Sequence, residues 1–464
     1  MTNRFYDLIE QTFYFPQEGF HLQDGSLAFH KLQLMDLVKS YGTPLRISYL
    51  PIISTRIQQA RKNFSWAFER HNYQGQYFYS YCTKSSHFSF ILEKVLENQA
   101  HLELSSSFDI DLVQHLISKG LIDPDKLLIC NGFKPRRYRQ KIKELISQGF
   151  THTIPVVDTK EELADYEDIG GEEVPIGLRM AIQQEPTFEF YTSRLGIRPE
   201  EVIDFYKQYI KDHPRFQLKM LHFFISSGIK DTVYYWSELN RFIDLYCQLK
   251  QICPELRYLN VGGGLQIKQS LHFDYDYSYM IDEIVGQIQK GCHEANVPEP
   301  DIVTEFGTYT VGESGALLFS VLEQKLQNDR ELWYMIDGSL MTTLPDIWGI
   351  RQQYILLPVN KWDQAYQRVN IGGLSCDEHD FYNPDKHRAD VYLPELERSG
   401  EPLYFGFFHM GAYQEELNGF GGLKHCLQPS PQHLVIDFDP DGNLHHELFA
   451  DEQQPKEMMQ LLGY

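Results

Sequence analysis

Residues of the kinds used in catalysis recur at the ends of short apolar runs in this sequence. They are Lys84, Glu103, Ser105, Ser106, Asn131, Asp158, Arg179, Ser226, Ser227, Gly262, Gly263, Gly264 and Glu305. Where a chain alternates strands and helices, the carboxyl ends of the parallel strands share one face, so polar residues placed there meet. A lysine, several carboxylates, hydroxyl groups and a glycine-rich turn on one face are typical of a cofactor site.

Lys84 ends the run QYFYSYCTK (76–84), in which aromatic residues dominate. A lysine partly removed from water has a lowered pKa and is suited to a Schiff base with a carbonyl carbon. The alternative is a surface lysine whose apolar stem lies over its neighbours while the ammonium group stays in water.

The segment VGGGL (261–265) follows an apolar run and precedes a stretch with helical spacing. Its three glycines allow backbone N–H groups to approach a phosphate, although an ordinary tight turn has the same composition. Glu305 could hold a protonated ring nitrogen or form an ion pair. Arg179 could balance the negative charge of Glu305 or contact cofactor oxygens. For His222 and Phe224 we expect places in an aromatic core.

Several common catalytic motifs are absent. Neither HxxxH, HExxH nor clustered Cys and His occurs, so we expect no metal site, and GxSxG and GxGxxG are also missing. The segment LSCDEHD (374–380) places the Cys376 thiol beside carboxylates. A thiol can donate a proton to a carbanion and carboxylates can hold a cation, but a capped loop is the alternative. Tyr413, in GAYQE (411–415), is either a ligand contact or a packed aromatic.

Eight runs rich in β-branched and aromatic residues carry these side chains, and stretches with helical spacing separate the runs. The runs are 76–84, 101–106, 127–132, 152–158, 175–181, 218–226, 256–262 and 301–307. Eight such units predict an α/β fold with a (β/α)8 TIM-type barrel over residues 46–310. Short apolar runs with Pro and Gly then predict a C-terminal antiparallel β-domain over 311–464, to which an N-terminal arm (1–45) contributes.

The composition excludes several classes of protein. Of the 464 residues, 42 are Lys or Arg and 64 are Asp or Glu, and this net charge of −22 repels nucleic acid and anionic lipid while it suits a cationic small molecule. No apolar run is long enough to span a bilayer, and the N-terminus does not resemble a signal peptide. Seven scattered cysteines without a CxxC spacing favour a cytoplasmic protein.

Long strings elsewhere in the chain carry a resemblance to a known family. Together with Lys84, GGG and Glu305, they make the sequence similar to the fold-type III pyridoxal-phosphate decarboxylases, and within that group most similar to the biosynthetic arginine decarboxylases. The resemblance covers roughly residues 40–425. The strings are CNGFKPRRY (130–138), SLMTTLPDIWGI (339–350), LSCDEHD (374–380) and GFFHMGAYQEELNGFGG (406–422).

The resemblance implies pyridoxal 5'-phosphate as cofactor and three catalytic residues. Lys84 would hold the cofactor covalently, Glu305 would keep its ring nitrogen protonated, and Cys376 would return a proton to the substrate. The other residues at cofactor-binding positions are Glu103, Ser106 with the trailing Asp109, Arg179, Phe224, Ser227, Gly262, Gly263, Gly264 and Tyr413. The candidates for substrate binding are Asp377, Asp337, Asp346 and Asp380. Because the cysteine and aspartate of relatives reach across from a second subunit, a homodimer with shared active sites is implied.

The sequence departs from the family pattern in three ways. Phe224 stands where relatives usually place a histidine against the cofactor ring, and Thr308 stands where a phosphate-binding arginine is common. The chain is also shorter than typical biosynthetic arginine decarboxylases and lacks their inserted helical segment. These departures affect substrate identity more than cofactor chemistry.

The sequence therefore predicts a decarboxylase of a basic amino acid, with arginine converted to agmatine and CO2 for polyamine and spermidine biosynthesis. The same chemistry on ornithine, lysine, diaminopimelate or a carboxylated polyamine is the first alternative. A catalytically silent regulatory relative is the second, although retention of Lys84, Glu305 and Cys376 argues against it. A racemase is disfavoured by the Cys376–Asp377 pair.

Overall fold

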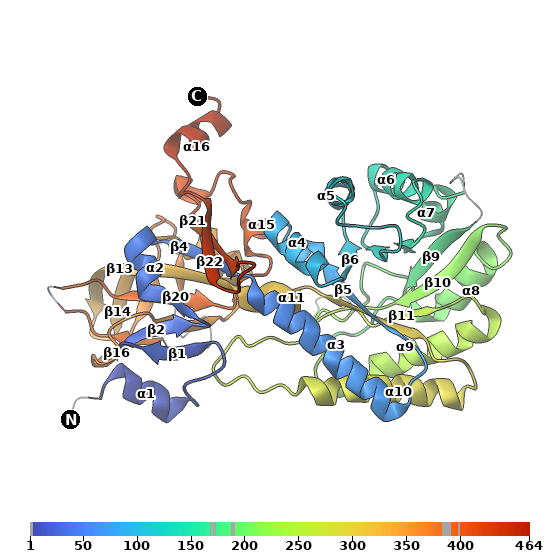
Figure 1. Ribbon diagram of the computed structural model, residues 1–464, viewed down its shortest axis with the longest axis horizontal. Helices are drawn as coiled ribbons and strands as arrows, with labels where there is room; N and C mark the ends of the chain where they lie inside the picture. Colours follow the sequence, from blue (N-terminus) through green and yellow to red (C-terminus); the bar gives the residue numbers. More distant parts are fainter. Residues whose placement is uncertain (1–2, 168, 170–172, 187–190, 383–390, 398–399) are drawn as a thin grey trace. The chain divides into compact units, whose positions relative to one another are not determined.

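The computed structural model describes residues 3–167, 169, 173–186, 191–382, 391–397 and 400–464 (Figure 1). The chain forms two compact units. The barrel unit comprises Ile53–Gln266 and Tyr275–Thr310, and the sheet unit comprises Met1–Ile52, Ile267–Asp274 and Val311–Tyr464.

Eight parallel strands close into a barrel, as the sequence predicts. Each of the eight expected runs overlaps one strand, although β9 and β10 begin one and two residues before their runs, and the pairing of β12 with β5 closes the ring. The strands are β5 (Tyr77–Cys82), β6 (His101–Leu104), β7 (Leu128–Cys130), β8 (Thr153–Val157), β9 (Val174–Arg179), β10 (Phe216–His222), β11 (Tyr258–Asn260) and β12 (Asp301–Phe306). Because all eight are parallel, their carboxyl ends lie on one rim of the barrel.

Helices alternate with these strands along the chain (Figure 1). They are α3 (Pro51–His71), α4 (Ser89–Glu97), α5 (Ser107–Ser118), α6 (Arg136–Ser147), α7 (Lys160–Ala164), α8 (Pro199–Tyr209), α9 (Val233–Ile252), α10 (Tyr277–Glu294) and α11 (Thr308–Val311), with the one-turn η1 (Thr83–Ser85) after β5. Apolar side chains from several strands, among them Ile129, Val156, Met220 and Val303, pack into a buried cluster. The strands are thereby fixed as a rigid frame for their polar ends.

The sheet unit is built on a nine-stranded, mostly antiparallel sheet. Its strands are β4 (Leu45–Tyr49), β13 (Gly315–Asn328), β14 (Glu331–Ile336), β15 (Ile355–Pro358), β17 (Asn370–Gly372), β18 (Phe381–Tyr382), β20 (Tyr404–Phe408), β21 (Gln432–Phe438) and β22 (Leu444–Ala450). Two pairs, β4 with β21 and β14 with β17, are parallel, which the expected antiparallel domain did not include. A parallel pair needs a long crossover, and the whole barrel lies in sequence between β4 and β21.

Smaller elements complete the sheet unit. They are a three-stranded sheet of β1 (Phe20–Gln23), β2 (Ser26–Phe29) and β3 (Leu32–Gln33), the pair β16 (Tyr366–Arg368) and β19 (Tyr392–Pro394), the helices α1 (Phe5–Thr12), α2 (Leu34–Tyr41), α12 (Leu340–Thr343), α13 (Pro345–Ile350), α15 (Gln414–Asn418) and α16 (Pro455–Leu461), and the single turns η2 (Gly312–Ser314) and η3 (His425–Leu427). A large aromatic and aliphatic core that includes Phe319, Tyr334, Phe405 and Phe407 lies within this unit.

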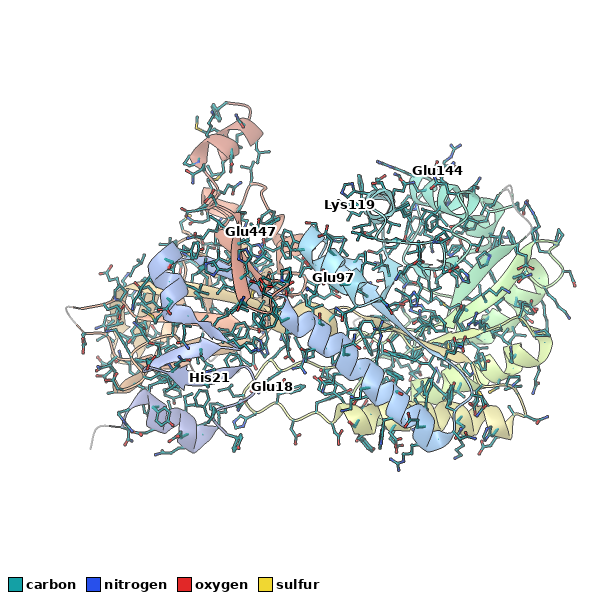
Figure 2. The ribbon with its side chains drawn as sticks, viewed as in Figure 1. Glu18, His21, Glu97, Lys119, Glu144 and Glu447 are labelled. Carbon is teal, nitrogen blue, oxygen red and sulfur yellow. The ribbon has the colours of Figure 1, made fainter. Side chains whose placement is uncertain are left out.

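Many of the acidic side chains behind the negative net charge lie on the surface. Glu97, Glu144 and Glu447 are examples of exposed carboxylates (Figure 2). A search of the described helices found no candidate for a segment that crosses a bilayer.

Candidate active site

The carboxyl rim of the barrel carries the residues expected to do chemistry there. Lys84 lies in η1 directly after β5, Glu103 lies on β6, and Ser106 caps the first turn of α5. Arg179 is the last residue of β9, and Glu305 lies on β12. The prediction from sequence thus placed these five residues on the correct rim.

Lys84 faces a buried carboxylate. Its Nζ forms an ion pair with Glu103 Oε2, and the Lys84 side chain retains 42% of its exposure while that of Glu103 retains 1%. A lysine in this position is held by charge and remains open to a small molecule. Its partial exposure and its buried ion-pair partner leave both environments considered from the sequence open.

Glu305 is a buried carboxylate with three polar side-chain partners. Its Oε1 accepts hydrogen bonds from Asn131 Nδ2 at 2.9 Å and from Asn260 Nδ2 at 2.7 Å, and its Oε2 lies 3.2 Å from His222 Nε2. Burial alone raises the pKa of this carboxyl. Attraction to His222 and Lys84 and the hydrogen bonds outweigh burial, so the net effect is a lowered pKa. Glu305 is therefore an ionised, fixed carboxylate that can hold an N–H group.

The contacts of two residues with Glu305 were not predicted from the sequence. His222 is buried, as expected, but it faces Glu305 rather than only filling a core, and Asn260 was not singled out. They lie on β10 and β11, far from Glu305 along the chain. The available signal in the sequence was that His222 and Asn260 are polar residues within otherwise apolar runs.

The glycine segment after β11 is a tight turn with no room for side chains. A Cβ on Gly263 would lie 2.0 Å from the Glu305 carbonyl oxygen, and Gly262 has a φ of +69°. The Glu305 N–H donates to the Gly262 carbonyl at 2.8 Å, and the Ile229 N–H donates to the Gly264 carbonyl at 2.9 Å. The turn therefore lies against Glu305 and against the loop that follows β10.

That loop binds an anion within this chain. The Glu185 carboxylate accepts hydrogen bonds from the Ser227 N–H at 2.5 Å, from the Ser226 hydroxyl at 3.0 Å and from the Ser226 N–H at 3.4 Å. Glu185 is 5% exposed. Adjacent backbone N–H groups that converge on one carboxylate form an anion site, so the loop has the donors that a phosphate requires. No motif in the sequence marks Glu185, which lies in an irregular segment between β9 and α8.

Arg179 and Phe224 lie against each other on the same rim. The guanidinium carbon of Arg179 is 5.8 Å from the centre of the Phe224 ring, and both residues are half-buried. Desolvation lowers the pKa of Arg179, in opposition to attraction from Asp158, Glu305 and Glu103. A flat ring and a flat cation at this place can accommodate an aromatic ligand.

Ser106 and Asp109 have local structural partners. Ser106 Oγ accepts the Asp109 N–H at 3.2 Å, and the Asp109 carboxylate accepts the N–H groups of Ser105 at 2.7 Å and Ser106 at 3.0 Å. His87 Nε2 lies 2.8 Å from the other oxygen of Asp109. These contacts form a capping box at the start of α5. Thr308, at the position of the usual arginine, begins α11.

The other expected residues belong to the sheet unit. Asp380 is buried and accepts the N–H groups of Met341 at 3.0 Å and Ser375 at 3.1 Å. Asp337 accepts the Ser320 N–H at 2.9 Å and its hydroxyl at 2.7 Å. Both carboxylates are therefore held by hydrogen bonds within the sheet unit.

Asp346 and Tyr413 are half-buried, and Asp377 is partly open to solvent. Asp346 Oδ2 accepts a hydrogen bond from Gln414 Nε2 at 2.8 Å, and burial raises its pKa despite this bond. Tyr413 has a left-handed backbone conformation and precedes α15. Cys376 is exposed, beside Asp377 in sequence. Asp377 accepts the His379 N–H at 2.8 Å, so it has one backbone donor, as Asp337 does, whereas Asp380 has two.

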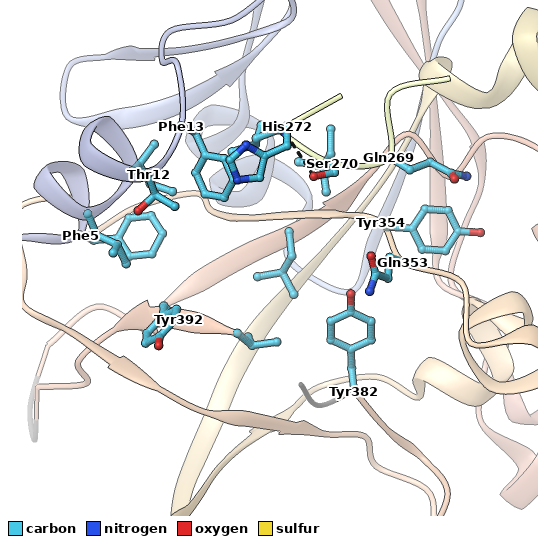
Figure 3. A pocket seen from close by; sticks show the side chains of 16 residues that line it. Phe5, Thr12, Phe13, Gln269, Ser270, His272, Gln353, Tyr354, Tyr382 and Tyr392 are labelled. Atoms are coloured by element: carbon cyan, nitrogen blue, oxygen red, sulfur yellow. Dashed lines mark hydrogen bonds between the residues drawn. The ribbon is translucent and has the colours of Figure 1, made fainter. Parts of the chain in front are cut away.

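A cavity of about 430 Å³ lies in the sheet unit (Figure 3). Its lining includes Phe5, Phe13, His272, Tyr354 and Tyr382. None of the residues singled out from the sequence lines it, so this cavity is separate from the candidate site.

Comparison with known proteins places these observations in a family. The sequence profile described as "Pyridoxal-dependent decarboxylase, pyridoxal binding domain" matches residues 53–312. The chain is 23% identical over 557 residues to the biosynthetic arginine decarboxylase of Thermosynechococcus vestitus, with 95% of this chain and 85% of that protein covered. It is 23% identical over 513 residues to arginine decarboxylase 1, chloroplastic, of Arabidopsis thaliana, with 86% and 72% covered.

Solved structures show the same fold. The biosynthetic arginine decarboxylase from Campylobacter jejuni aligns with a TM-score of 0.79 at 19% identity, covering 99% of this chain and 90% of that one. Diaminopimelate decarboxylase from Helicobacter pylori, complexed with L-lysine, aligns with a TM-score of 0.72 at 17% identity, covering 92% and 99%.

Proposed function

Because the chain belongs to the family of pyridoxal-dependent decarboxylases, we propose that it converts L-arginine to agmatine and CO2. The cofactor of the family is pyridoxal phosphate, and the coarser activity is decarboxylation of a basic amino acid. The observation that carries the proposal is the ionised Glu305 carboxylate, fixed by three partners and attracted to the half-buried Lys84 on one rim. The arginine decarboxylases among the relatives support arginine as substrate.

The residues present fit the cofactor. The N–H groups of Ser226 and Ser227 already bind a carboxylate and would hold the phosphate, and the glycine turn packs directly against the loop that carries them. Lys84 would hold the cofactor covalently, and Glu305 would accept a hydrogen bond from its protonated ring nitrogen. When bound, pyridoxal phosphate supplies an electron sink for the bond that breaks as CO2 leaves.

The chain's own groups would complete the reaction. Glu103 keeps the Lys84 ammonium group in place before the cofactor arrives, and Phe224 would lie against the cofactor ring. The Cys376 thiol would donate a proton to the substrate carbon after CO2 leaves. Asp377, with Asp346 as a further candidate, would pair with the guanidinium of arginine, for which a bidentate carboxylate is well suited. Cys376 and Asp377 would serve the site of a second subunit in a homodimer.

A side-by-side assay tests the substrate. Holoenzyme is supplied with arginine, ornithine, lysine, diaminopimelate or a carboxylated polyamine, and CO2 release is measured. We expect kcat/KM for arginine to exceed that for each other substrate by at least about tenfold, because an unpaired buried charge penalises a poorly matched substrate. Preference for another amino acid would show that arginine is not the preferred substrate, while decarboxylation would still be the reaction. No release from any substrate would favour a catalytically silent protein.

Glu185 provides a second test of the site. Its carboxylate competes with a phosphate dianion for the same N–H groups and repels it. We expect Glu185→Gln to bind pyridoxal phosphate about three- to tenfold more tightly, as measured by titration of the apoenzyme followed by protein fluorescence. Glu144→Gln, at an exposed carboxylate on α6, is the matched control and is expected to leave the Kd unchanged. Weaker binding by Glu185→Gln would mean that the phosphate is held elsewhere.

A further inference from the structure

The sheet unit contains a cluster of metal-ligating side chains, of which only Cys376 has a role in the proposed function. The sulfurs of Cys376 and Cys426 and a ring nitrogen of His425 all lie within 4.8 Å of one another. The two sulfurs are 3.3 Å apart. The three residues are exposed, so an ion can reach them from solvent.

Asp377 lies beside His425 of this cluster. Its Oδ2 lies 3.8 Å from His425 Nε2, and its Oδ1 lies 3.1 Å from His379 Nδ1 and accepts the His379 N–H at 2.8 Å. Contacts of this kind behind a ligand orient it toward an ion. The cluster thus offers two sulfurs and one nitrogen, with the Asp377 carboxylate next to His425.

The spacing of these atoms fits a tetrahedral ion. Zinc bonds of about 2.0–2.3 Å to oxygen, nitrogen and sulfur place neighbouring ligand atoms of a tetrahedron about 3.3–3.8 Å apart. Two sulfurs on one Zn²⁺ ion belong at the upper end of that range, and the sulfurs of Cys376 and Cys426 are 3.3 Å apart, within about 0.5 Å of that value. Thiolate and imidazole ligands favour Zn²⁺ over Mg²⁺ or Ca²⁺.

We infer that Cys376, Cys426 and His425 form a binding site for Zn²⁺, with Asp377 as a partner behind His425. Each thiol releases one proton to solvent as its sulfur replaces a water molecule on the ion. The site could not be predicted from the sequence, because the two cysteines are 50 residues apart. A search for closely spaced ligands does not detect such a pair.

Zinc at this site has a consequence for catalysis. A Cys376 sulfur bonded to the ion carries no proton and is not free to donate one to substrate. Zn²⁺ is therefore a reversible inhibitor of decarboxylation. This consequence rests on the proposed function, whereas metal binding itself does not.

Zinc titration of the holoenzyme tests the site. With the thiols kept reduced by a phosphine, Zn²⁺ is titrated in competition with a chromophoric chelator, and Co²⁺ is added separately to detect sulfur-to-metal absorption. We expect one ion per chain, and at least about tenfold weaker binding in both Cys426→Ser and His425→Gln, because loss of a direct ligand costs no less than loss of an outer partner. His445→Gln, at an exposed histidine of the same unit, is the matched control and should bind normally.

Activity measurements complete the test. Cys426→Ser is expected to keep the uninhibited rate and to lose inhibition by Zn²⁺, which chelator reverses in the wild type. Absence of stoichiometric binding, or binding unchanged in both variants, would overturn the inference. A chain that binds zinc without decarboxylating any substrate would contradict the proposed function alone, and one that decarboxylates without binding zinc would contradict the zinc site alone.

Discussion

Substitution of Lys84 by alanine is expected to lower the rate of decarboxylation by at least about 1,000-fold, since the residue that bonds to the cofactor acts at every turnover. Lys84 lies directly after β5 and pairs with Glu103, and alanine leaves no nitrogen at that position. The visible absorbance of the protein-bound cofactor should disappear at the same time. Steady-state CO2 release and an absorbance spectrum of the purified variant measure both effects.

Two variants control for lost charge and for general damage. Lys84→Arg keeps the positive charge beside Glu103 but does not bond to the cofactor, so it should be as inactive as Lys84→Ala. Lys119→Ala, at an exposed lysine on the barrel unit, should behave like the wild type (Figure 2). An active Lys84→Ala protein with an unchanged spectrum would remove Lys84 from the site.

The second large effect concerns Glu305. We expect Glu305→Gln to lower kcat by about 100-fold or more, because the neutral amide no longer stabilises a protonated ring nitrogen where charge develops. The substitution keeps the shape and can still accept from Asn131 and Asn260. The fold should therefore persist, which circular dichroism checks. Glu97→Gln, at an exposed carboxylate, is the matched control (Figure 2).

The pH dependence of stability gives an independent measure of Glu305. Its pKa in the folded chain is lowered from the ordinary value of 4.5, so its ionised form stabilises the fold above that pH. This contribution is lost as the pH falls from about 4.5 through the lowered pKa. Glu305→Gln should thus lose less stability than the wild type over that acidic range. Full activity in Glu305→Gln would contradict its role at the ring nitrogen.

Local patterns in the sequence were sufficient to predict the barrel. Each strand is a short β-branched or aromatic run, and parallel strands bring their polar ends to one rim, so Lys84, Glu103, Arg179 and Glu305 could be placed before any coordinates were known. The family and its cofactor, expected from the longer strings, are confirmed by the profile match over 53–312.

Contacts between distant parts of the chain could not be predicted in this way. His222 is 83 residues from Glu305, and Asn260 is 45 residues away. Glu185 lies in an irregular loop whose partners depend on a turn 41 residues later. Such pairs form when the barrel closes and do not follow from local periodicity. The burial of His222 was therefore predicted, but its contact with Glu305 was not.

The bond between the cofactor and Lys84 is the central feature of the proposed active site. Borohydride reduction of the holoenzyme makes this bond permanent, and peptide mass analysis then locates it. We predict one cofactor per chain, attached to Lys84. Attachment to Lys134, a buried lysine after β7 that pairs with Glu162, or retention of no cofactor by any peptide, would contradict the account.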